Sequence, residues 1–95
     1  MVVGTLKLSL YIHNNHSLKE KRKVVKSIVA KVHKKFNVSI AEIGSNDKWQ
    51  MVELGISAVG NDRRFVNSAL DNILSFLDSL YLGEIIDSTM EIVNV

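Results

Sequence analysis

The start of the chain alternates hydrophobic and polar positions. Over residues 1–13, every second side chain is apolar from position 6 onward: Leu6, Leu8, Leu10 and Ile12. A period of two is typical of a strand with one buried face. Similar runs predict three more strands, at residues 38–43, 49–60 and 84–93. In the third of these four strands, the positions expected to face inward are Val52, Leu54, Ile56 and Ala58.

Two segments have the helical period instead. Ser17 followed by Glu20 is a capping box, and it predicts a helix over residues 18–36. The apolar stripe of this helix consists of Leu18, Val25, Ile28, Val29, Val32 and Phe36. Asn61 or Asp62 is suited to cap a second helix, which Gly83 ends. Its apolar stripe consists of Phe65, Val66, Ala69, Leu70, Ile73, Leu74, Leu77 and Leu80.

The order of elements is therefore βαββαβ, which predicts a single ferredoxin-like α+β domain over residues 1–95. We expect a four-stranded antiparallel sheet with both helices on one face. Right-handed crossovers place the first and third strands in the centre. The short connection at residues 44–47 makes the second and third strands a hairpin. This topology brings residues 13–23 close to residues 44–49.

The distribution of charge suggests a binding surface, because the net charge of +2 hides a difference between one segment and the rest of the chain. Residues 17–36 contain eight basic side chains and one acidic one, a net +7, so the rest of the chain carries −5. A helix start carries partial positive charge, and the basic side chains there make an electrostatic conflict that a bound polyanion relieves. We predict RNA binding, with structured ribosomal RNA as the first candidate and mainly phosphate contacts. The predicted contact residues are Lys19, Lys21, Arg22, Lys23, Lys26, Lys48 and Trp49.

The sequence leaves other interpretations of the helix and of the sheet open. The charged helix is also consistent with an ordinary solvated face. The outward face of the sheet offers Tyr11, Trp49 and Met51, but the third strand lacks the basic-Gly-aromatic pattern with which RNA-recognition domains stack bases. The alternative function is a protein-interaction module that acts through its sheet face or edge as a homodimer.

The chain shows no catalytic motif, so we predict a protein without enzymatic activity, cofactor or metal. His13, His16 and His33 lack metal-ligand spacing, and Ser17 serves as a helix cap. The rival enzyme hypothesis is a phosphate-ester hydrolase that uses the basic helix start as an anion site. The chain has no cysteine and no apolar run of membrane-spanning length, and its first residues resemble a strand more than a signal peptide. A cytoplasmic location is the expectation.

Three stretches resemble the YlxP-like family of small bacterial proteins of unknown function. These stretches are residues 17–28, residues 35–44 and residues 47–50, and the likeness extends from residue 1 to about residue 62. Genes of this family often lie beside genes for a translation initiation factor and a ribosome-binding factor. The resemblance therefore implies a ferredoxin-like fold and, by association, a role near ribosome assembly or translation. The matching motif positions are Ser17, Leu18, Lys19, Glu20, Lys21, Arg22, Asn37, Glu42, Gly44, Asp47 and Trp49.

Overall fold

The predicted order of elements is confirmed. A computed structural model describes residues 1–95, and its ferredoxin-like α+β fold has two helices and four strands. These are β1 (Val2–Tyr11), α1 (Leu18–Lys35), β2 (Ser39–Gly44), β3 (Met51–Gly60), α2 (Arg63–Ser79) and β4 (Glu84–Asn94).

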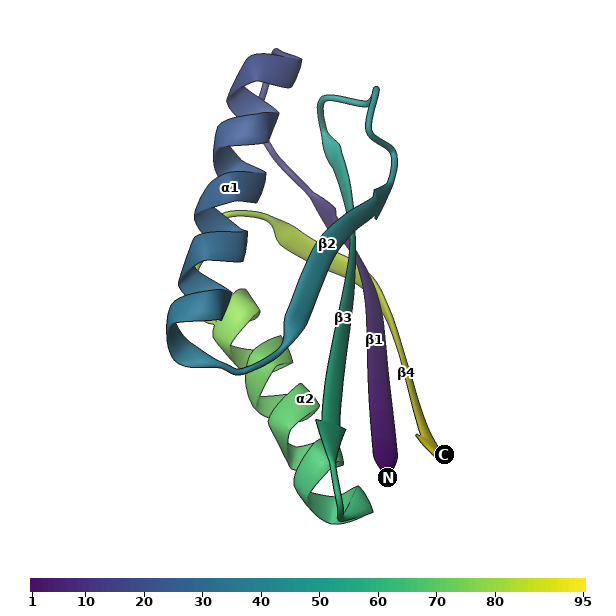
Figure 1. Ribbon diagram of the computed structural model, residues 1–95. Helices are drawn as coiled ribbons and strands as arrows, with labels where there is room; N and C mark the ends of the chain where they lie inside the picture. Colours follow the sequence, from purple (N-terminus) through teal and green to yellow (C-terminus); the bar gives the residue numbers. More distant parts are fainter.

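All strand pairs in the sheet are antiparallel. The strand order is β2-β3-β1-β4, so β1 and β3 lie in the centre as predicted. Both helices lie on the same face of the sheet (Figure 1). The first helix packs over β2 at one edge, whereas α2 packs over β1, β3 and β4. The opposite face of the sheet has no helix against it.

The hydrophobic core lies between this sheet and the two helices. The inward positions predicted for the first and third strands are all buried. Because the register pairs Leu6 with Ile56 and Leu8 with Leu54, the central strands present one continuous apolar surface to the helices. From α1, Ile28 and Val32 are buried against this surface. The contribution of α2 to the core is Val66, Leu70, Ile73 and Leu77.

A glycine sets the distance between α2 and the central strand. A Cβ atom added at Gly4 would lie 2.4 Å from Cγ1 of Val66 and 2.8 Å from Cδ1 of Leu70. These separations are far shorter than an ordinary van der Waals contact. The absence of a side chain at position 4 therefore allows α2 to sit directly on β1.

The prediction that Phe65 belongs to the core is wrong, and two strand irregularities were not predicted. Phe65 is 66% exposed, because it lies in the first turn of α2, beside Gly60 at the end of β3. The register of β2 on β3 shifts at Ile43, and that of β4 on β1 shifts at Ile86. Each shift is a bulge that interrupts regular pairing near one end of an edge strand.

The molecule is elongated, with extents of 42 × 21 × 18 Å. Figure 1 shows that the first half of α1 extends beyond α2 and runs beside the turn between β2 and β3. The two chain ends lie together at the other end of the sheet. There, the backbone N–H of Val95 donates to the carbonyl of Met1 at 2.8 Å. Neither helix is long and apolar enough to cross a lipid bilayer.

Candidate nucleic-acid interface

The start of α1 is fixed by its cap. Ser17 is extended, and its Oγ accepts a hydrogen bond from the backbone N–H of Glu20 at 3.1 Å. The carboxylate of Glu20 in turn lies 3.5 Å from the backbone N–H of His16. The predicted cap is therefore present, with the reciprocal contact displaced by one residue. The single acid in the first turn contacts the helix start and forms no ion pair with the nearby lysines.

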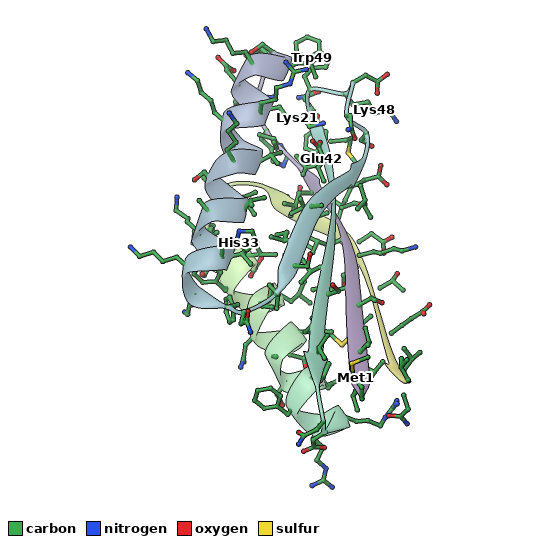
Figure 2. All side chains as sticks on the ribbon, viewed as in Figure 1. Met1, Lys21, His33, Glu42, Lys48 and Trp49 are labelled. Atoms are coloured by element: carbon green, nitrogen blue, oxygen red, sulfur yellow. The ribbon has the colours of Figure 1, made fainter.

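Four of the predicted contact residues form one exposed ridge on α1. Figure 2 shows nitrogen-tipped side chains that project from the outer side of this helix. Their spacing of three and four residues places them on neighbouring turns of one helix face. None of them takes part in an ion pair. We call this set the α1 ridge: Lys19, Arg22, Lys23 and Lys26.

Lys21 does not belong to this ridge, so its prediction as a phosphate contact is wrong. The residue is only 1% exposed and points inward from α1 (Figure 2). Its Nζ lies 2.9 Å from Oε2 of Glu42 and donates a hydrogen bond to the carbonyl of Ser45 at 2.5 Å. A lysine surrounded by protein and already paired with a carboxylate has no free charge to offer a surface ligand.

The inward position of Lys21 has a signal in the sequence. Lys21 precedes Ile28 by seven residues and Val32 by eleven, and both spacings keep side chains on one face of a helix. Lys21 therefore lies in the middle of the apolar stripe. Its partner Glu42, in contrast, has no signal in the sequence, because the contact depends on the fold, which places β2 beside α1.

A second polar contact joins the same two segments. Asn15 is 5% exposed, and its side-chain amide donates to the carbonyls of Ser17 and Trp49. The turn that carries Trp49 is itself closed by a hydrogen bond from the N–H of Lys48 to the carbonyl of Ser45, at 3.0 Å. The predicted proximity of residues 13–23 to residues 44–49 is thus confirmed, and buried polar side chains mediate it.

The two predicted residues of the turn differ in placement. Trp49 lies beside the start of α1 with 49% of its surface exposed, so its indole ring is accessible next to the α1 ridge. Lys48 is exposed on the outer side of the turn and points away from α1 (Figure 2). The structure therefore places Trp49 at the start of α1 and Lys48 away from this helix.

The exposed surface of α1 is strongly positive even though Lys21 is buried and does not contribute to it. Residues 17–36 contain seven exposed basic side chains and a single exposed carboxylate, that of Glu20. Three of these bases, Lys31, Lys34 and Lys35, lie near the end of the helix, where they complement its negative pole. The exposed charge is therefore spread along the whole outer side of α1, over a length of about 27 Å.

The remaining polar chemistry of the surface is modest. The ring of His13 makes a hydrogen bond with the carboxylate of Glu84 at 2.9 Å, and both side chains are mostly exposed. These two residues line an open depression together with Asn14, Asp78 and Tyr81. No three histidine, aspartate or glutamate side chains converge in a way that suits a metal ion.

Fold and surface together define the class: a small ferredoxin-like α+β protein whose first helix presents an exposed basic face. A family of proteins of unknown function, DUF503, matches residues 3–90, and the chain belongs to this family. It is also similar to the uncharacterized protein YlxP of Bacillus subtilis (strain 168). The two are 44% identical over 78 residues, which cover 82% of this chain and 85% of that protein. The resemblance to YlxP-like proteins is thereby confirmed.

A solved structure shows the same fold at low sequence identity. A variant of SnoaB, a cofactor-independent oxygenase from Streptomyces nogalater, matches with a TM-score of 0.53 and 14% identity. The match covers 98% of this chain and 92% of that one. At this identity the likeness concerns the fold alone, because ferredoxin-like folds carry many unrelated functions.

Proposed function

We propose that this protein is a non-enzymatic RNA-binding protein that contacts the phosphates of structured RNA through the α1 ridge. The observation that carries the proposal is the presence of four unpaired basic side chains on one exposed face of the first half of α1, beginning at the pole where the helix itself is positive. A negative ligand placed there interacts favourably with both sources of potential. Ribosomal RNA, in connection with ribosome assembly or translation in the cytoplasm, is the first candidate.

The ridge is suited to positioning RNA more than to reading its sequence. Lysine and arginine on a convex helix meet phosphates, and such contacts are shared by all sequences. Trp49 adds one aromatic surface on which an unpaired base could stack at the end of the ridge. We therefore expect weak sequence preference and a preference for folded RNA that has an unpaired base beside a duplex.

The decisive variant changes Lys19, Arg22 and Lys23 together to Gln. If four phosphates are neutralised, parent affinity for an RNA hairpin falls about 100-fold between about 50 and about 200 mM salt. The variant retains one ridge charge, so its affinity is lower at the lower salt concentration and falls only about threefold over the same interval. Fluorescence anisotropy with a labelled hairpin measures both slopes.

The chain offers a matched control for this experiment. Changing Lys7, Arg63 and Arg64 to Gln removes the same three charges from exposed positions outside α1. This control should keep the salt slope of the parent. Equal slopes for all three proteins, or no binding by the parent at low salt, would remove the proposal and leave the interaction-module alternative.

A specific observation favours that alternative as a second candidate function. On the helix-free face, the register places Val3 between Val59 and Val93, which makes a row of three valines across the sheet. Val59 is 63% exposed and Val93 is 46% exposed. A second copy packed face to face would cover this row. Light scattering at rising protein concentration tests the homodimer, and a constant monomer mass would contradict it.

A further inference from the structure

The last third of the chain carries charge of one sign only. After Arg64 there is no basic residue, and five carboxylates follow, all of them exposed: Asp71, Asp78, Glu84, Asp87 and Glu91. Two of these acids are on α2 and three are on β4. The side of the molecule formed by β4 is therefore as consistently acidic as α1 is basic. Polyanions are repelled from this side, so the RNA proposal does not involve it.

The strand β4 is also an open edge of the sheet. It pairs with β1 on one side and has no strand on the other. Figure 1 shows no other element beyond its outer side. A free edge presents unpaired backbone N–H and C=O groups, which another extended chain can satisfy. Natural edges are commonly protected by lysine, proline or irregular backbone, and β4 contains neither lysine nor proline.

The regular part of this edge is well defined. The bulge at Ile86 precedes it, and pairing with β1 is then continuous from Asp87 to Asn94. The hydrogen bonds between Val95 and Met1 hold the far end of the strand in place. The edge is therefore a continuously paired stretch of eight residues, which is long enough for strand addition.

Side chains beside this edge select what can pair with it. The register with β1 places Asp87, Thr89, Glu91 and Val93 on the helix-free face. The carboxylate of Glu84 is occupied by His13, whereas those of Asp87 and Glu91 take part in no ion pair. Lys7 of β1 lies opposite Thr89 on the same face, but it forms no ion pair with either carboxylate. The edge thus combines free backbone groups with two carboxylates that have no ion-pair partner.

A second copy of β4 brings like charges together at this edge in two of its possible registers. Antiparallel pairing of two copies about Thr89 would place Asp87 opposite Glu91 of the second copy. Pairing about Glu91 would place the two Glu91 side chains opposite each other. Like charges directly opposite each other destabilise a strand pair. An extended segment with lysine or arginine at alternate positions has the complementary charge in either register.

We propose that the edge of β4 binds an extended basic segment of a partner protein by strand addition. Backbone hydrogen bonds along residues 87–94 align the segment, and its cations pair with Asp87 and Glu91. Because β4 and β2 are opposite edges of the sheet, and α1 packs over β2, the α1 ridge stays free while the edge is occupied. Basic chains of this kind are themselves typical RNA binders, so partner and RNA could be held together.

The test uses a capped peptide that alternates lysine and threonine over the length of β4. Nuclear magnetic resonance titration should shift the amide signals of residues 87–94 and slow their hydrogen exchange. Changing Asp87 to Asn and Glu91 to Gln together should weaken binding about three- to tenfold, the range expected for two exposed ion pairs. A matched variant with Asp71→Asn and Asp78→Asn removes the same charge from α2 and should bind like the parent.

A second peptide separates strand addition from simple charge attraction. N-methylation of alternate backbone amides keeps every lysine but removes the donors that pair with the edge. The proposal requires this peptide to bind much more weakly than the first. Equal binding of both peptides, protection outside β4, or no binding at low salt would each overturn it. No RNA is present, so the outcome is independent of the RNA-binding proposal.

Discussion

Lys21 and Glu42 form an ion pair in which the lysine is buried and the glutamate side chain is 21% exposed. Removing a charged pair from water is expensive, and buried pairs often stabilise a protein no more than apolar residues of the same size. The pair has a clear geometric effect, because Nζ of Lys21 also holds the carbonyl of Ser45. It thereby fixes the turn that carries Trp49 against the start of α1. We infer that Lys21 positions the proposed interface without touching the RNA.

A prediction follows for substitution of this lysine. Changing Lys21 to Met leaves the carboxylate of Glu42 without its partner and should lower the free energy of unfolding by about 2–4 kcal/mol. The double variant Lys21→Met with Glu42→Leu removes both charges and should return to within about 1 kcal/mol of the parent. Urea unfolding measures both differences.

Fluorescence of the single tryptophan supplies a second measurement for the same variants. The double variant should show altered Trp49 emission even if its stability is restored, because the turn has lost its contact with Lys21 and keeps only that with Asn15. Lys23→Met, a change on the exposed α1 ridge, is the matched control. A single variant as stable as the parent would show that the pair contributes nothing.

How far sequence predicts individual residues depends on where their partners lie. The inward positions of β1 and β3 were predictable because alternation along one strand determines them. The burial of Lys21 was predictable from its helical spacing to Ile28 and Val32, although its charge suggested an exposed position. The contacts of Glu42 with Lys21 and of Asn15 with Trp49 link distant segments, so no local pattern contains them.

The helix α1 has little electrostatic support of its own. Lys19 and Lys23 are four residues apart, as are Arg22 and Lys26, and each such like-charged pair destabilises a helix by about 0.2–0.5 kcal/mol. The first half of the helix contributes no apolar side chain that is fully buried. Its attachment to the rest of the molecule depends on the cap at Ser17, on Lys21, and on partly buried neighbours.

Moderate salt should therefore stabilise the free protein. Raising sodium chloride from about 10 to about 150 mM shortens the screening length to about 8 Å and weakens repulsion along α1. We expect the free energy of unfolding to rise by about 1 kcal/mol. The variant with Lys19, Arg22 and Lys23 changed to Gln should start more stable and respond less. Thermal unfolding at both salt concentrations decides this, and loss of stability with salt would contradict it.

At the element scale, sequence periodicity predicted every helix and strand, but the edges needed the structure. The bulges at Ile43 and Ile86 depend on how two strands meet, although the second coincides with the adjacent Ile85 and Ile86, which break the alternation of β4. Phe65 follows the apolar period of α2 but lies where the sheet has already ended, so nothing remains to bury it. The spacing of apolar residues predicts which side of a helix or strand is apolar. The length of the sheet or helix packed against that side determines how much of it is buried.

At the scale of the whole molecule, opposite charges lie at opposite edges of one sheet. The basic helix packs over β2, and the acidic strand β4 forms the far edge. A net charge of +2 conceals this separation completely. The charge asymmetry of residues 17–36 was visible in the sequence, whereas its separation from β4 follows from strand order. The proposed RNA and partner surfaces can be occupied together because the sheet lies between them.

The pairing of β4 with β1 also has a consequence for how the chain folds during its synthesis. The register joins Val2 to Asn94, so the central strand β1, the first of the six elements to be synthesised, pairs on one side with β4, the last of the six. Until β4 has been synthesised, β1 has β3 as its sole available neighbour in the sheet, and its other edge stays open. Such distant pairings slow folding and leave apolar strands exposed to aggregation in the meantime.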